Sequence, residues 1–167
     1  PSYIYTSDEV IVPGFLPDIS GVRDEIVQYF NSVKRLDDTV GAVLKALDDS
    51  GEKQNTIVIF LSDNGMSEPF SKTNCYYQST RTPLIVYAPE RFVSKVVDTE
   101  HLISTVDFFP TIVDLLGLSV DADFDGTSFK PILEGKKQLY RTYVFTEFQS
   151  TSAEKTFIMR AVLGKRF

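Results

Sequence analysis

The feature that most constrains the fold is an unbroken run of β-branched and aromatic residues that ends in a polar turn. Residues 57–61 read Ile-Val-Ile-Phe-Leu, and Ser62, Asp63, Asn64 and Gly65 follow directly. A short apolar run without polar alternation predicts a strand buried on both faces, as in the centre of an α/β sheet. Open α/β sheets bind ligands at the carboxyl ends of their strands, so the acid and the amide are site candidates. An ordinary turn uses the same residue types, and spacing alone favours that alternative.

A long amphipathic helix is predicted before this strand. Apolar residues recur at intervals of three and four: Ile26, Phe30, Val33, Leu36, Val40, Leu44 and Leu47. Ser20 is the expected N-cap and Gly51 the expected stop, while Gly41 indicates either close approach to a strand or simple tolerance. A helix, a short link and a buried strand make one αβ unit, which predicts an α/β fold with a mostly parallel central sheet flanked by helices.

The remaining segments extend this α/β pattern. Residues 1–17 carry Pro13 and Pro17 among apolar residues and predict an extended surface segment. Residues 66–81 predict a long polar and aromatic loop. We expect a strand at 82–88, helices at 105–116 and 128–134, and strands at 142–148 and 156–163. The apolar face of the helix at 105–116 would consist of Val106, Phe109, Ile112, Val113 and Leu116. The expected organisation is an α/β domain over residues 1–135, followed by a small antiparallel region at 136–167 that looks truncated.

Composition narrows the classes of function. A net charge of -6 without a run of basic residues argues against a nucleic-acid partner, and no apolar stretch is long enough to span a membrane. The single Cys75 excludes an internal disulfide, and the single His101 excludes a histidine-rich zinc cluster.

The chain opens on proline and closes on a strand-like run, which suggests a piece of a longer protein. Part of a sheet would expose apolar faces and strand edges, so we expect self-association.

Several motifs together resemble one family. The segments Asn55–Gly65, Arg81–Val86, Val106–Gly117 and Asp125–Gly135 are similar, in this order, to motifs of the sulfatases. The resemblance runs from about residue 20 to the end of the chain. The tyrosine-rich loop at 72–77 looks more like the N-sulfoglucosamine sulfohydrolase branch than the arylsulfatases.

The resemblance implies an alkaline-phosphatase-like fold and hydrolysis of a sulfate ester or N-sulfate, with a sulfated carbohydrate as the expected substrate. The family nucleophile is a formylglycine made from the cysteine of a C-x-P-S-R motif in the N-terminal half of the enzyme. Cys75 is followed by Tyr-Tyr-Gln, so it is not that cysteine, and we expect a loop or half-buried thiol. The chain alone would therefore be inactive, and its partner would be the remaining half of the same enzyme. By analogy, the location would be periplasmic, secreted or lysosomal.

Three residues match functional positions of the family. Asp63 and Asn64 match ligands of a Ca²⁺ ion, and Lys72 matches the cation that binds the sulfate. Carboxylate and amide oxygens are hard donors that suit Ca²⁺, whereas a related zinc phosphatase would want histidine in place of Asn64. Two ligands fall short of the six to eight that calcium takes, so we expect weak or no binding by this chain alone. We expect Arg81 to form a structural ion pair and His101 to be non-catalytic.

Two other interpretations stay open at this point. The chain could come from a metal-dependent phosphodiesterase or phosphomutase of the same superfamily, although Asn64 and the shortage of histidine speak against it. It could also be a non-catalytic interaction module.

Overall fold

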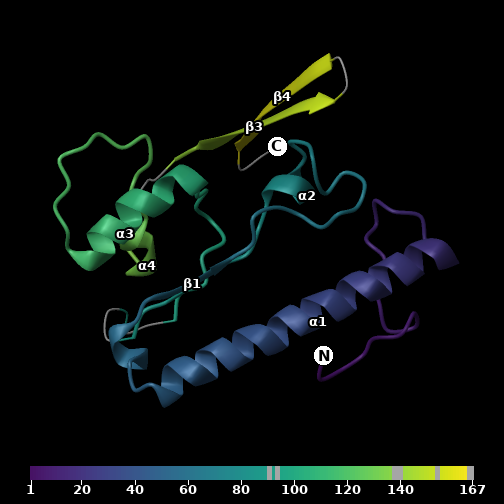
Figure 1. Ribbon diagram of the computed structural model, residues 1–167. Coiled ribbons are helices and arrows are strands. Elements are labelled where there is room, and N and C mark those ends of the chain that lie inside the picture. Colours follow the sequence, from purple (N-terminus) through teal and green to yellow (C-terminus); the bar gives the residue numbers. More distant parts are fainter. Residues whose placement is uncertain (90–91, 93–94, 137–140, 153–154, 165–167) are drawn as a thin grey trace.

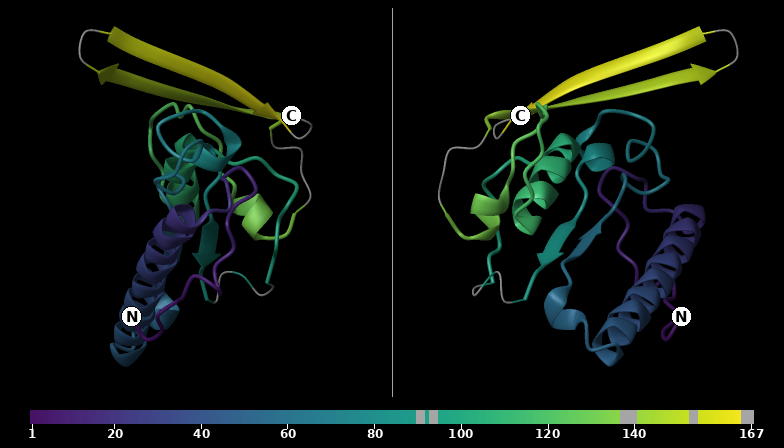
Figure 2. Two further views of the ribbon diagram at one scale, coloured as in Figure 1. Left: turned by 90° about the vertical axis from the view of Figure 1, so that its right-hand side faces the viewer. Right: turned by 60° about the vertical axis from the view of Figure 1, so that its left-hand side comes forward.

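A two-stranded ribbon lies between one long helix and a pair of shorter helices. The computed structural model describes residues 1–89, 92, 95–136, 141–152 and 155–164. The elements in order are α1 (Ser20–Asp49), η1 (Lys53–Asn55), β1 (Val58–Leu61), α2 (Tyr77–Thr80), β2 (Leu84–Tyr87), η2 (Thr105–Asp107), α3 (Phe108–Leu116), α4 (Lys130–Leu133), β3 (Tyr143–Ser152) and β4 (Lys155–Gly164). Figure 1 places α1 on one side of the ribbon and α3 with α4 on the other. The hairpin of β3 and β4 projects from this body, as both views of Figure 2 show.

The expected parallel pairing is wrong for the strands that the structure describes. Strands β1 and β2 pair antiparallel, with Val58 opposite Tyr87 and Leu61 opposite Leu84. A parallel neighbour would need a crossover that carries the chain back to the start of β1. The segment between the two strands contains only the four-residue helix α2, so the chain turns round and returns beside β1.

The expected antiparallel region near the C-terminus is confirmed by β3 and β4. Their register runs from Tyr143 opposite Gly164 to Ser152 opposite Lys155. Both strands are longer than the sequence pattern indicates. A division of the chain at residue 135 stays a prediction, and residues 137–140 just beyond it lie outside the described residues.

The long helix forms where the apolar periodicity predicts it. Its N-cap is Ile19, so the expected cap Ser20 is instead the first helical residue. Gly51 adopts a left-handed conformation with φ 77° just after the helix, a geometry that glycine allows at low energy. Neither α1 nor any other helix in the described part of the chain is long and apolar enough to cross a membrane.

The N-terminal segment lies along α1 and is bound to it by side-chain contacts. The side chain of Asn31 accepts a hydrogen bond from the backbone N–H of Tyr5 at 2.8 Å and donates one to the Tyr5 carbonyl at 3.3 Å. The ring of Tyr5 meets the ring of Phe30 edge-on, with 5.4 Å between centroids. Hydrogen bonds from the hydroxyl and the backbone N–H of Ser2 lower the pKa of Asp38 to about 2. The expected extended segment is thus a partner of α1.

Gly41 lies within α1, and no other described element packs closely against it. A Cβ atom added at Gly41 meets no atom of the described residues within 4 Å, and the backbone there is helical. We therefore expect Gly41→Ala to raise the free energy of unfolding by about 0.5 to 1 kcal/mol, because alanine loses less backbone entropy than glycine on folding. Urea unfolding followed by circular dichroism measures the change. A destabilised variant would show that another surface packs on Gly41.

The apolar face predicted for the helix at 105–116 is not the face that is buried. Segment 125–133 packs on the other side of α3, where Thr111 and Leu115 are buried with Phe129 and Ile132. Phe109 is 57% exposed and Leu116 is 50% exposed. Other exposed apolar side chains lie on α1 and the ribbon: Val33, Leu36, Val43, Leu44, Leu61, Ile85 and Tyr87. Large apolar patches favour association, so self-association stays a prediction.

A fully buried carboxylate ties the start of α3 to two later segments. Asp107 has no exposed surface and accepts hydrogen bonds from the backbone N–H groups of Ser104 at 2.8 Å and Thr127 at 2.9 Å. The guanidinium of Arg141 forms an ion pair with it. The hydroxyl of Thr111 adds a link, since it accepts from the N–H of Phe129 at 3.0 Å. This network explains why a charged residue sits among apolar neighbours.

Candidate functional site

The polar residues after β1 form a turn that is stabilised by its own side chains. The hydroxyl of Ser62 donates to the carbonyl of Asn64 at 3.0 Å, and the backbone N–H of Asn64 donates to Oδ1 of Asp63 at 2.9 Å. Asp63 is exposed and Asn64 is half-buried. Oxygen donors thus lie at the end of the strand, where the sequence places them.

Gly65 is the point at which the following loop folds back onto this turn. Its N–H donates to the carbonyl of Ser79 at 3.1 Å. A Cβ added at Gly65 would lie 2.2 Å from the carbonyl oxygen of Ser71 and 2.1 Å from that of Gln78. Only a residue without a side chain fits between these two carbonyls. The contact brings the backbone beside Lys72 against the residue that follows Asn64.

Lys72 is exposed and lines an open hollow of about 470 Å³. Within the described residues its ammonium group forms no ion pair or hydrogen bond, while its carbonyl accepts from the side chains of Thr73 and Asn74. The lining consists of Ser67, Glu68, Pro69, Phe70, Lys72, Thr73 and Asn74. Asp63 and Asn64 do not line this hollow. The structure therefore joins the two backbone segments that carry these residues at Gly65, while the side chains of Asp63 and Asn64 do not line the hollow beside Lys72.

Arg81 and Cys75 lie in the same region as Lys72, and each makes one defining contact. Arg81 lies over the ring of Tyr77, with 5.3 Å from its guanidinium carbon to the centroid, and forms no ion pair among the described residues. Among the described residues a cation–π contact stands in place of the expected ion pair, which stays a prediction. Cys75 is buried, and its Sγ lies 3.6 Å from the carbonyl oxygen of Met159 in β4. The thiol thus contacts the hairpin.

The donor set at the end of β1 matches calcium in chemistry but not in number. Asp63 offers a carboxylate and Asn64 an amide oxygen, and both are hard ligands. Calcium takes six to eight oxygens, and the described residues contain no group of three or more acidic, histidine or cysteine side chains placed to hold a metal. These residues alone do not form a complete metal site.

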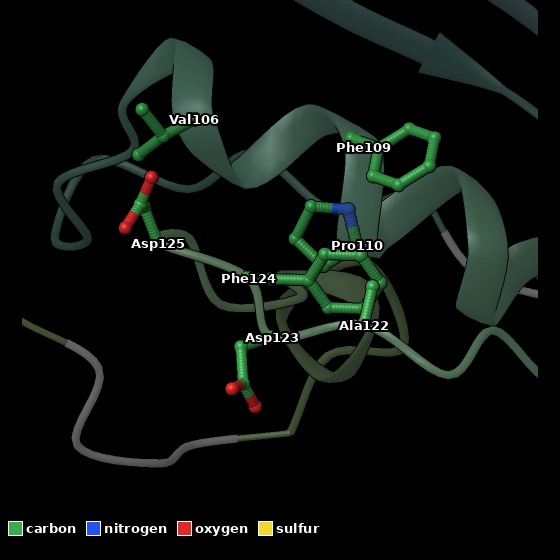
Figure 3. A pocket seen from close by; sticks show the side chains of 7 residues that line it. All are labelled: Val106, Phe109, Pro110, Ala122, Asp123, Phe124 and Asp125. Carbon is green, nitrogen blue, oxygen red and sulfur yellow. The ribbon is translucent and has the colours of Figure 1, made fainter.

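A second hollow lies beside the start of α3, and its lining differs in charge from that of the hollow beside Lys72. It encloses about 360 Å³ and is lined by Val106, Phe109, Pro110, Ala122, Asp123, Phe124 and Asp125. Figure 3 shows the side chains of Phe109, Pro110 and Phe124 on one side of this lining and the carboxylates of Asp123 and Asp125 on the other. Its lining has two acidic groups and no cation, so it would repel an anionic ligand. The hollow beside Lys72 is the better candidate for an anion.

The comparisons with known proteins point to the same family as the sequence motifs. The family model described as Sulfatase matches residues 5–118, which is more than half of the chain and includes the turn after β1 and the loop with Lys72. The chain belongs to the sulfatase family.

Two curated sulfatases match almost the whole chain. An ulvan-active sulfatase of Formosa agariphila is 32% identical over 167 residues, covering 100% of this chain and 27% of that protein. The N-sulphoglucosamine sulphohydrolase of Homo sapiens is 33% identical over 172 residues, covering 98% of this chain and 34% of that protein. The chain thus spans about a third or less of the length of these sulfatases.

A solved structure of a related protein also resembles this fold. It was determined in complex with its substrate D-glucosamine-2-N,6-O-disulfate, and it superposes with a TM-score of 0.67 at 27% identity. The match covers 86% of this chain and 30% of that one. The sulfatase-like fold is therefore matched in part, although the described strands form two small antiparallel sheets.

Proposed function

We propose that this chain supplies the metal-binding acid and amide and the sulfate-binding lysine of a sulfatase that acts on a sulfated sugar. The observation that carries the proposal is the contact at Gly65, which joins the turn containing Asp63 and Asn64 to the loop containing Lys72. Membership of the sulfatase family and the sugar substrates named for similar proteins support it. The bond to be broken would be the S–O bond of a sulfate ester or the S–N bond of an N-sulfate.

Each of the three residues would have a separate task. The ammonium of Lys72 would bind a sulfuryl oxygen and stabilise negative charge that develops there during hydrolysis. Asp63 and Asn64 would hold a Ca²⁺ ion together with ligands from the rest of the protein, and the ion would add positive charge next to the sulfo group. The nucleophile would come from the same remaining part. The 167-residue chain by itself should then be inactive.

The test of the lysine uses the full-length product of the gene with N-sulfoglucosamine and with an aryl sulfate. We expect Lys72→Ala to lower kcat/KM by about 100-fold, because one preorganised charge that faces the developing anion is lost. Lys72→Arg keeps the charge and should retain more activity than Lys72→Ala. Steady-state release of sulfate measures both variants.

A matched control is available on α1. Lys45 is also exposed, and within the described part of the chain its one ion pair is with Asp49 at the surface. Lys45→Ala should therefore leave kcat/KM unchanged. If Lys72→Ala turns over substrate as fast as Lys45→Ala, Lys72 does not bind the sulfate. If the wild-type protein releases sulfate from neither substrate, the proposed function is wrong.

A further inference from the structure

The hollow beside Lys72 combines three kinds of group that together suit a sulfated sugar ring. Phe70 offers an aromatic face and is 53% exposed, although phenylalanine usually lies inside proteins. Lys72 offers a cation and Glu68 a carboxylate that accepts hydrogen bonds. The volume of about 470 Å³ falls within the range of about 300 to 1,000 Å³ that is typical of small-molecule sites.

The backbone on either side of Lys72 is in an unfavourable conformation. Phe70 has φ 67° and Thr73 has φ 60°, and they are the only residues other than glycine with positive φ in the described part of the chain. The left-handed region is costly for aromatic and β-branched residues. Such outliers persist where the surrounding structure holds them, and they cluster at ligand-binding sites. The strain is confined to the segment that presents the Phe70 ring and the Lys72 ammonium.

The residue between Phe70 and Lys72 anchors this segment. Ser71 is 1% exposed, its N–H donates to the carbonyl of Glu68 at 3.0 Å, and its carbonyl lies against Gly65. Its buried hydroxyl has no hydrogen-bond partner among the residues that the structure describes. The anchor and its two strained neighbours are therefore poorly optimised for stability, which is common where a loop is shaped for binding.

A second ring helps to fix the aromatic surface. Tyr76 is 56% exposed and its ring lies against that of Phe70, with 5.8 Å between centroids. The Tyr76 N–H donates to the side chain of Asn74 at 2.8 Å, and the Asn74 amide donates to the carbonyl of Lys72 at 2.8 Å. These bonds hold the aromatic pair and the lysine in one local arrangement.

We propose that residues 67–74 form the subsite for the sugar ring that carries the sulfo group, an inference that rests on the proposed function. The apolar face of the ring stacks on Phe70, the sulfo group meets Lys72, and hydroxyl groups of the sugar donate hydrogen bonds to Glu68. Phe70 is thus a specificity-determining residue: it binds the carbohydrate part of the substrate, while the lysine binds the part that every sulfatase substrate shares.

The test replaces the ring without disturbing the backbone. Asparagine tolerates the left-handed conformation, so Phe70→Asn should fold while lacking the aromatic face, and Phe70→Tyr should keep that face. In the full-length protein we expect Phe70→Asn to raise KM for N-sulfoglucosamine about 10-fold, with a much smaller effect on kcat. For Phe70→Tyr we expect a KM within about 2-fold of the wild-type value. This change is small compared with the roughly tenfold rise in KM expected when the ring is lost.

Phe157 supplies the matched control, because it is a phenylalanine on β4 that is 59% exposed and does not line the hollow. Phe157→Ala should leave KM unchanged. Calorimetric binding of N-sulfoglucosamine gives a second readout that needs no turnover. If Phe70→Asn binds this sugar as tightly as Phe157→Ala does, or if the wild type does not bind it, the subsite is refuted. If the wild type binds through Phe70 without releasing sulfate, the subsite stands and the proposed function fails.

Discussion

Replacing Asp107 by alanine is expected to lower the free energy of unfolding by about 3 to 5 kcal/mol. The carboxylate is fully buried and joins three segments through the N–H groups of Ser104 and Thr127 and the guanidinium of Arg141. Alanine would leave two backbone donors without this acceptor and remove the charge that faces Arg141. Leaving buried polar groups unpaired costs more than the intact bonds contribute. Urea unfolding of the full-length protein measures the loss.

Two variants make this result interpretable. Asp107→Asn keeps the shape of the side chain and loses its charge, so its stability should fall between those of the wild type and Asp107→Ala. Asp121 is an exposed acid in the same part of the chain, and Asp121→Ala should change stability by less than about 0.5 kcal/mol. A loss below about 1 kcal/mol in Asp107→Ala would mean that the network contributes little to the fold.

Replacing Gly65 by alanine is expected to cost about 3 kcal/mol or more and to weaken substrate binding as well. The new Cβ would lie 2.1 Å from the carbonyl oxygen of Gln78 and 2.2 Å from that of Ser71. Both atoms belong to the backbone, so no rotamer change relieves the clash, and the loop must move away from β1. Because Ser71 precedes Lys72, the displacement would also move the lysine that we propose binds the sulfate.

Gly41→Ala is the control for this substitution, since it adds the same methyl group at a position where none of the residues that the structure describes lies within 4 Å. The two alanine variants should therefore change stability in opposite directions. We also expect Gly65→Ala to raise KM for N-sulfoglucosamine in the full-length protein. A Gly65→Ala variant with wild-type stability and KM would show that the loop does not depend on this contact.

The sequence predicted the elements better than their pairing. Periodicity located α1, an unbroken apolar run located β1, and strand-like stretches located the hairpin, because these patterns are local. The direction of β2 relative to β1 depends on how the loop of residues 62–83 returns, and no periodic pattern encodes that path. The exposed face of α3 was missed for a similar reason, since an apolar stripe indicates that a face can be buried but not what covers it.

Some residues singled out in the structure were predicted from the sequence, and others were not. Asp63, Asn64 and Lys72 were found from the order of the sulfatase motifs, and their roles stay predictions. The contribution of Phe70 and Thr73 had no signal in the sequence, because left-handed backbone is expected at glycine or asparagine and not at these residues. The role of Asp107 had a weak signal: a serine three residues before an acid is a common helix start.

The contact between Cys75 and the hairpin makes the single sulfhydryl group of this chain an intrinsic reporter. Because the side chain is buried against β4, we expect an alkylating reagent to reach the sulfur faster when β4 moves away from the loop that carries the lysine. The rate of labelling would therefore report how often this part of the molecule opens. Substrate that holds the loop in place should slow the labelling, so occupancy could be followed without an engineered probe.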